Sequence, residues 1–105
     1  MIADTPATSR SVDEILHLLR RHEAEIRARY AVRALGVFGS FVRGEATAGS
    51  DLDLLIEFEH PPTLFEFVRL QRHLSELLGI PVDLTMKSAL KPAIGQAILR
   101  EVVPV

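Results

Sequence analysis

The sequence contains no cysteine, which excludes disulfide bonds and thiolate metal sites. It has no apolar run long enough to span a membrane as a helix, and its first ten residues lack the apolar core of a secretion signal. Basic residues are not in excess, since the formal net charge is −2 at pH 7, whereas a protein that binds nucleic acid directly is usually basic. These absences predict a cytoplasmic protein without membrane contact or direct nucleic-acid binding.

The residues that are present favour one ordinary globular domain. Hydrophobic residues make up 48% and charged residues 25% of the 105-residue chain, a balance that suits a folded protein of this length. We expect residues 1–10 to form a flexible tail and residues 11–105 to form the domain.

The hydrophobic pattern predicts three helices and three strands. Helices are expected over residues 12–30, 64–78 and 92–100, and strands over residues 32–38, 51–58 and 82–85. Ser11 with Glu14, and Thr63 with Glu66, have the form of capping boxes, which mark where the first two helices begin. The order of these elements predicts an α+β fold, in which helices pack on one small sheet.

Two aspartates stand at the head of the second expected strand. Carboxylates are poor strand residues, yet Asp51 and Asp53 open an apolar run. Alternate residues of a strand share one face, so both carboxylates project together while Leu52 and Leu54 project into a core. Asp83 lies in the third expected strand. If that strand lies beside the second, three carboxylates converge, and hard oxygen ligands of this kind select Mg²⁺ or Mn²⁺.

A glycine–serine turn follows the first expected strand. Gly39 lets the backbone approach a phosphate closely, and the helical turn expected over residues 41–44 points free N–H groups at that phosphate, with the Ser40 hydroxyl as a further donor. Arg43, one turn on, adds positive charge. A phosphate cradle facing a metal cluster suits phosphoryl-type transfer, which requires mainly positioning and neutralisation of charge.

The segment GSFVRGEATAGSDLDLLIEF, residues 39–58, resembles the signature of the polymerase-beta-type nucleotidyltransferase superfamily. The shared pattern is Gly-Ser, ten residues, then Asp-x-Asp, with a later acid in a short strand. Because the chain is so short, it is most similar to the minimal nucleotidyltransferases, which consist of the catalytic domain alone. The resemblance covers about residues 12–103 and implies the nucleotidyltransferase fold, with a small mixed sheet.

The resemblance also implies an activity and a partner. Minimal nucleotidyltransferases are antitoxins paired with HEPN-domain RNase toxins, and the family resembles enzymes that transfer AMP from Mg²⁺-bound ATP to a tyrosine of the toxin. By residue match, Gly39 and Ser40 would hold the triphosphate, with Arg43 beside them. Asp51 and Asp53 would bind Mg²⁺, and Asp83 would be the third carboxylate, placed to act as base toward the incoming hydroxyl.

Other interpretations remain open at this point. The chain could be an antitoxin that masks its toxin by binding alone, or a nucleotidyltransferase that modifies a small molecule, as in antibiotic resistance. Phe41 could line the nucleotide site, and Lys87 and Lys91 could either reach phosphates or remain solvated. The apolar segment 102–105 could pack on the sheet or meet a partner.

Overall fold

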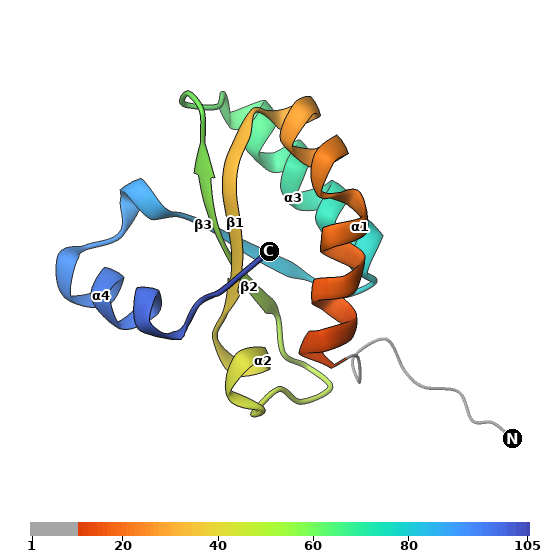
Figure 1. The fold of residues 1–105 in the computed structure, drawn as a ribbon, viewed down its shortest axis with the longest axis vertical. Coiled ribbons are helices and arrows are strands. Elements are labelled where there is room, and N and C mark those ends of the chain that lie inside the picture. Colours follow the sequence, from red (N-terminus) through yellow and green to blue (C-terminus); the bar gives the residue numbers. More distant parts are fainter. Residues whose placement is uncertain (1–10) are drawn as a thin grey trace, which may run out of the picture.

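A four-stranded mixed sheet forms the centre of the computed structural model, which describes residues 11–105 (Figure 1). The strand order is β3-β2-β1-β4. Strand β1 pairs antiparallel with both β2 and β4, whereas β2 and β3 are parallel. The strands comprise β1 Val32–Phe38, β2 Leu52–Phe58, β3 Val82–Met86 and β4 Val103–Pro104. The predicted α+β fold is therefore confirmed, while the expected tail, residues 1–10, lies outside the described residues.

Two long helices cover one face of the sheet, and a shorter one lies on the opposite side (Figure 1). Helices α1, Val12–Tyr30, and α3, Leu64–Leu78, begin at the predicted capping boxes, in which both reciprocal hydrogen bonds are present. Helix α4, Pro92–Glu101, is the element on the other side. No helix within residues 11–105 is both long and apolar enough to cross a membrane.

The side chains of β2 alternate between the two faces of the sheet, as predicted. Leu52, Leu54 and Ile56 are fully buried in the core that the long helices cover. Burial of each such side chain stabilises the fold by about 1.5–3 kcal/mol relative to exposure. Asp53 and Glu57 point to the opposite face and are half-buried. The apolar face fixes the register of β2, because a slip of one residue would bury these carboxylates in the core.

The structure defines the surroundings of Phe41 and Lys87, for which the sequence left two interpretations open. Phe41 is buried in the core, so packing accounts for it. Lys87 begins a short 3₁₀ turn, Lys87–Ala89, and lies 3.7 Å from Glu57.

The C-terminal apolar segment packs on the sheet, which settles one of the open alternatives. Pro104 lies opposite Gly36 in the short antiparallel pairing of β4 with β1. The absence of a side chain at Gly36 admits this segment, because a Cβ there would lie 2.5 Å from Val102 Cγ2 and 3.2 Å from the Val103 carbonyl oxygen.

Replacement Gly36→Ala is accordingly expected to destabilise the domain by about 1–3 kcal/mol, the usual cost of overpacking. Thermal unfolding followed by circular dichroism measures the loss. Gly49→Ala is the matched control, because a Cβ at Gly49 meets no atom within 4 Å. Equal melting temperatures for the two variants would contradict the close approach of β4.

Candidate active site

Two of the predicted carboxylates lie side by side on neighbouring strands. The parallel register of β2 and β3 places Asp53 directly beside Asp83, where adjacent strands are about 4.8 Å apart. The condition set by the sequence, that the third strand lies beside the second, is thus met. Asp51 lies one residue before β2, which begins at Leu52 rather than at residue 51, and its side chain is exposed.

The glycine–serine turn packs directly against Asp53. Gly39 has φ +84° and ψ −154°, a conformation that is essentially restricted to glycine. A Cβ on Gly39 would overlap the Asp53 carboxylate, with its Cγ at 3.0 Å. The helical turn that follows, α2 Ser40–Arg43, begins one residue earlier than predicted, and its last backbone N–H groups, at Val42 and Arg43, donate to the Gly39 carbonyl. The turn at the end of β1 therefore packs closely against the Asp53 carboxylate on β2 because residue 39 is glycine.

A further carboxylate, Glu101, which no sequence motif marked, enters this site from α4. Glu101 Oε2 accepts a hydrogen bond of 2.7 Å from the Gly39 backbone N–H, and its Oε1 accepts one of 2.8 Å from Arg43 Nη1. Arg43 Nε also donates to Glu45 at 2.8 Å. The one local signal for Glu101 was its acidic charge in the last turn of a helix, where the macrodipole disfavours a carboxylate.

These hydrogen bonds favour the charged forms of Arg43 and Glu101. Hydrogen bonding to Glu45, and then to Glu101, raises the pKa of Arg43 above its already high ordinary value. The hydrogen bond from Arg43, followed by that from the Gly39 N–H, lowers the pKa of Glu101. Both groups are therefore ionised at neutral pH.

Asp53 lies in an environment that disfavours its charge. Partial burial raises the pKa of Asp53 above the usual value, and the neighbouring charges of Asp83 and Asp51 raise it further. Repulsion among carboxylates is what a bound cation would relieve. The site also borders a cavity of about 290 Å³, lined by Phe38, Gly39, Arg43, Asp53, Ala97, Ile98 and Glu101.

The donor set suits a divalent cation in its chemistry, because all of its ligands would be carboxylate oxygens. Within residues 11–105, no three His, Cys, Asp or Glu side chains are gathered closely enough to hold a metal ion as they stand. Asp51 and Asp83 are exposed, however, and exposed side chains change rotamer freely. The convergence of three carboxylates on one cation stays a prediction.

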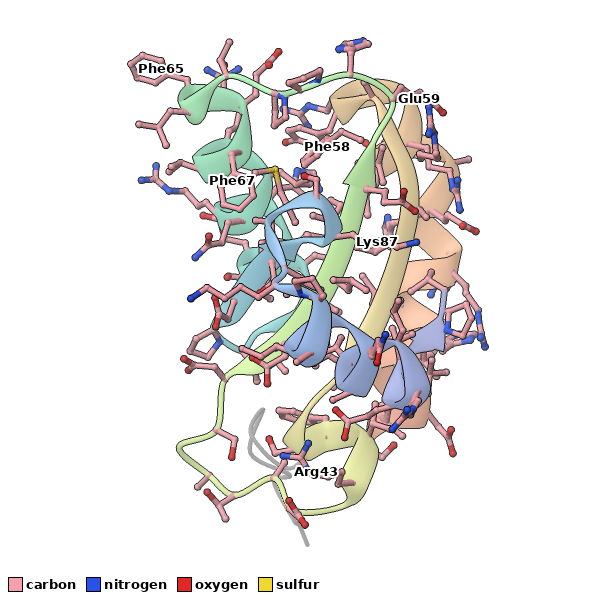
Figure 2. The ribbon with its side chains drawn as sticks, turned by 90° about the vertical axis from the view of Figure 1, so that its left-hand side faces the viewer. Arg43, Phe58, Glu59, Phe65, Phe67 and Lys87 are labelled. Atoms are coloured by element: carbon pink, nitrogen blue, oxygen red, sulfur yellow. The ribbon has the colours of Figure 1, made fainter. Side chains whose placement is uncertain are left out.

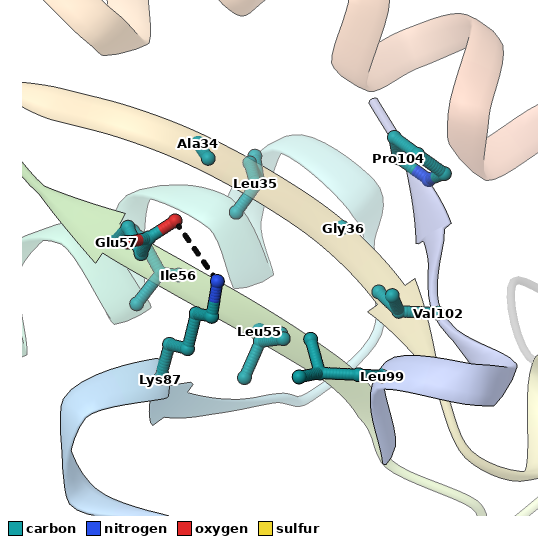
Figure 3. Close-up of a pocket in the computed structure, with 10 residues that line it drawn as sticks. All are labelled: Ala34, Leu35, Gly36, Leu55, Ile56, Glu57, Lys87, Leu99, Val102 and Pro104. Carbon is teal, nitrogen blue, oxygen red and sulfur yellow. Dashed lines mark ion pairs between the residues drawn. The ribbon is translucent and has the colours of Figure 1, made fainter. Parts of the chain in front are cut away.

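Within residues 11–105, neither Lys87 nor Lys91 forms an ion pair with the residues of this site. Lys87 pairs with Glu57, four residues beyond Asp53 along β2, roughly 13 Å away by the rise of a strand. Figure 2 shows Arg43, the last residue of α2, at the lower end of the molecule and Lys87 well above it. Lys87 and Glu57 line one side of a separate apolar hollow of about 140 Å³ between α4 and the sheet (Figure 3). Lys91 is exposed and precedes α4.

Comparison with known proteins gives consistent matches over most of the chain. The nucleotidyltransferase domain family matches residues 19–104. Protein adenylyltransferase MntA of Thermococcus cleftensis is 50% identical over 93 residues, which cover 89% of this chain and 94% of that protein. A solved structure assigned to the minimal nucleotidyltransferases has 38% identity and a TM-score of 0.74, and the alignment covers 93% of this chain and 99% of that one.

A more distant solved structure shares the fold alone. It is the complex of a tri-AMPylated HEPN toxin of Shewanella oneidensis with its MNT antitoxin, at 14% identity and a TM-score of 0.62, with 84% of this chain and 69% of that chain covered. The match over residues 19–104 and the 50% identity to a curated relative establish the family. The chain belongs to the nucleotidyltransferase family.

Proposed function

We propose that this nucleotidyltransferase is the antitoxin of a toxin–antitoxin pair and transfers AMP from ATP to a tyrosine of a HEPN-domain RNase toxin. The observation that carries the proposal is the meeting of Gly39, Asp53 and Asp83 at one end of the sheet, in a chain 50% identical to a protein adenylyltransferase. AMP transfer would silence the toxin. The cytoplasm is the proposed location, on the basis of the cysteine-free composition.

The residues of the site have separate proposed roles in nucleotide binding. The Gly39 N–H, the Ser40 hydroxyl and the Arg43 guanidinium are donors for the phosphate oxygens of ATP. Asp51 and Asp53, with Asp83, would hold a divalent cation, which we propose to be Mg²⁺ rather than Mn²⁺. When bound, the cation supplies positive charge that neutralises the phosphates.

Asp83 has a further role in the transfer itself. The tyrosine oxygen of the toxin forms a bond to the α-phosphorus of ATP, the bond to the bridging oxygen breaks, and pyrophosphate leaves. The phenolic proton passes to the Asp83 carboxylate, which acts as the general base. Asp83 is exposed at the edge strand β3, so a hydroxyl carried on another molecule can reach it.

The partner is also expected to complete the site. Asp51, Asp83 and Arg43 are all exposed, so water has free access to the reacting groups in the isolated chain. Exclusion of water strengthens the electrostatic interactions on which such transfer depends. We therefore expect little turnover of ATP without the toxin.

The intact mass of the partner tests the proposal. The protein encoded beside this chain is incubated with it, ATP and Mg²⁺, and its mass is measured. A gain of one or more AMP units is expected, and the variant Asp51→Asn, Asp53→Asn should give none. Unchanged mass together with a stable complex would overturn the transfer and favour neutralisation by binding alone. Unchanged mass without a complex would favour a different acceptor, such as a small molecule.

A further inference from the structure

Glu101 occupies two of the three donors that the proposed function assigns to a nucleotide phosphate. Its two carboxylate oxygens take the Gly39 N–H at 2.7 Å and the Arg43 guanidinium at 2.8 Å. A carboxylate and a phosphate present similar paired oxygens, and guanidinium and backbone N–H groups bind both. An anion supplied by the chain itself therefore fills the place of the ligand.

Nothing local explains why a carboxylate should be there. Glu101 is far from Gly39 in sequence and is brought to it by the fold. It stands in the last turn of α4, where the helix macrodipole disfavours negative charge. Its charge also opposes ionisation of the nearby Asp53. The gain that offsets these costs is the pair of charge-assisted hydrogen bonds with Gly39 and Arg43.

The helix that carries Glu101 is only lightly held. Within Pro92–Glu101, Gly95 is the one residue classed as buried. The side chains of Ile94 and Leu99 are 55% and 47% exposed. An element with few buried apolar contacts opens at low free-energy cost. Release of Glu101 would therefore not require disruption of the core.

We propose that Glu101 is an intramolecular phosphate mimic, which occupies Gly39 and Arg43 until the triphosphate of a nucleotide displaces it. The inference rests on the proposed nucleotide site. Binding must first open the Glu101 contacts. The apparent association constant of the free chain for nucleotide therefore equals that of the open state multiplied by the fraction of molecules that are open. Glu101 is thus a built-in competitor.

Binding measurements on charge-neutral variants test this inference. Glu101→Gln keeps the shape of the side chain and removes its charge, and Glu101→Ala removes the group. Isothermal titration with ATP and Mg²⁺, and separately with inorganic tripolyphosphate, is expected to show affinity about tenfold or more above that of the natural chain, since hydrogen bonds to charged groups are the strong ones. Binding of adenosine, which has no phosphate, is expected not to change.

Glu45→Gln is the matched control. Like Glu101, Glu45 is a carboxylate that accepts a hydrogen bond from Arg43, with Arg43 Nε and Glu45 Oε1 2.8 Å apart, and its replacement also removes one negative charge. Among the described residues, however, Glu45 makes no hydrogen bond with Gly39. Its effect on triphosphate affinity should be clearly smaller than that of Glu101→Gln.

Three results would overturn the inference in different ways. Unchanged or weaker binding by both Glu101 variants would make Glu101 a positioning residue for Arg43. An equal gain of triphosphate affinity in Glu45→Gln would show that the effect comes from the loss of any negative charge near Arg43 and not from release of the Gly39 N–H. Failure of the natural chain and of every variant to bind ATP or tripolyphosphate would contradict the proposed nucleotide site itself. Circular dichroism of each variant verifies that it is folded.

Discussion

Replacement of Asp53 by asparagine is expected to abolish AMP transfer and, in metal-free buffer at pH 7, to raise the melting temperature. The transfer should fall by at least about 10²-fold, the scale on which loss of one charge-stabilising group lowers an enzyme's rate. The stability should rise because partial burial and the charges of Asp83 and Asp51 disfavour the ionised Asp53 in the folded state. Asparagine has nearly the same shape and carries no charge.

The pH dependence of this gain follows from the direction of the pKa shift. The pKa of Asp53 is raised in the folded protein above the ordinary value of 3.8. Below that ordinary value, the carboxyl is protonated in both the folded and the unfolded state, so the natural chain and the variant should not differ on this account. As pH rises through the raised pKa, ionised Asp53 opposes folding, and the advantage of the variant should reach its full size.

Differential scanning calorimetry at several pH values measures the effect, with chelator present. Glu76→Gln, a neutralisation on the exposed surface of α3, is the control for general loss of negative charge. A variant that unfolds at a lower temperature than the natural chain at pH 7 would show that the Asp53 carboxylate stabilises the fold. Site residues that serve function at the expense of stability are expected where a ligand later supplies the missing interaction.

The parts of this fold that could be predicted from sequence are those with local signals. Helices α1 and α3 begin where Ser11 and Thr63 cap them, because each capping box uses residues only three apart. Helix α3 ends at Gly79, whose left-handed conformation favours glycine. Predicting that Asp53 and Asp83 share one face also required the strand order, which no local pattern gives.

The parts that could not be predicted depend on contacts between distant segments. The contact of Glu101 with Gly39 joins the end of α4 to the end of β1. Strand β4 depends on the missing side chain of Gly36 and not on the strand propensity of two residues. Phe41 gave no sign of its burial, because its one-turn helix is too short to show a periodic face.

Replacement of Gly39 by alanine is expected to have the largest effect on stability. The backbone of Gly39 has φ +84° and ψ −154°, where residues with a side chain are strained by about 1–3 kcal/mol. The new methyl group would also overlap the Asp53 carboxylate. Rotation of the carboxylate would not remove the overlap, because the Asp53 Cβ would also lie 3.1 Å from the new methyl group and is fixed by backbone pairing with Phe38 and with Asp83. Overpacking of this kind adds about 1–3 kcal/mol.

Gly44→Ala separates the two contributions. Gly44 also has a positive φ, of 72°, but a Cβ there meets no atom within 4 Å. Its replacement should therefore incur the backbone strain of a left-handed residue, about 1–2 kcal/mol, without the steric overlap. Each kcal/mol lowers the melting temperature of a domain of about this size by about 4–8 °C, which thermal denaturation resolves easily.

The same pair of variants also bears on nucleotide binding. Because strand pairing on both sides holds Asp53, relief of the overlap must move the turn, so the Gly39 N–H would no longer lie where Glu101 and the proposed phosphate meet it. Gly39→Ala should then lose affinity for tripolyphosphate as well as stability, whereas Gly44→Ala should lose mainly stability. If the two variants lose equal stability and both keep tripolyphosphate affinity, the close packing of Gly39 against Asp53 has no functional consequence, and the phosphate must be held elsewhere.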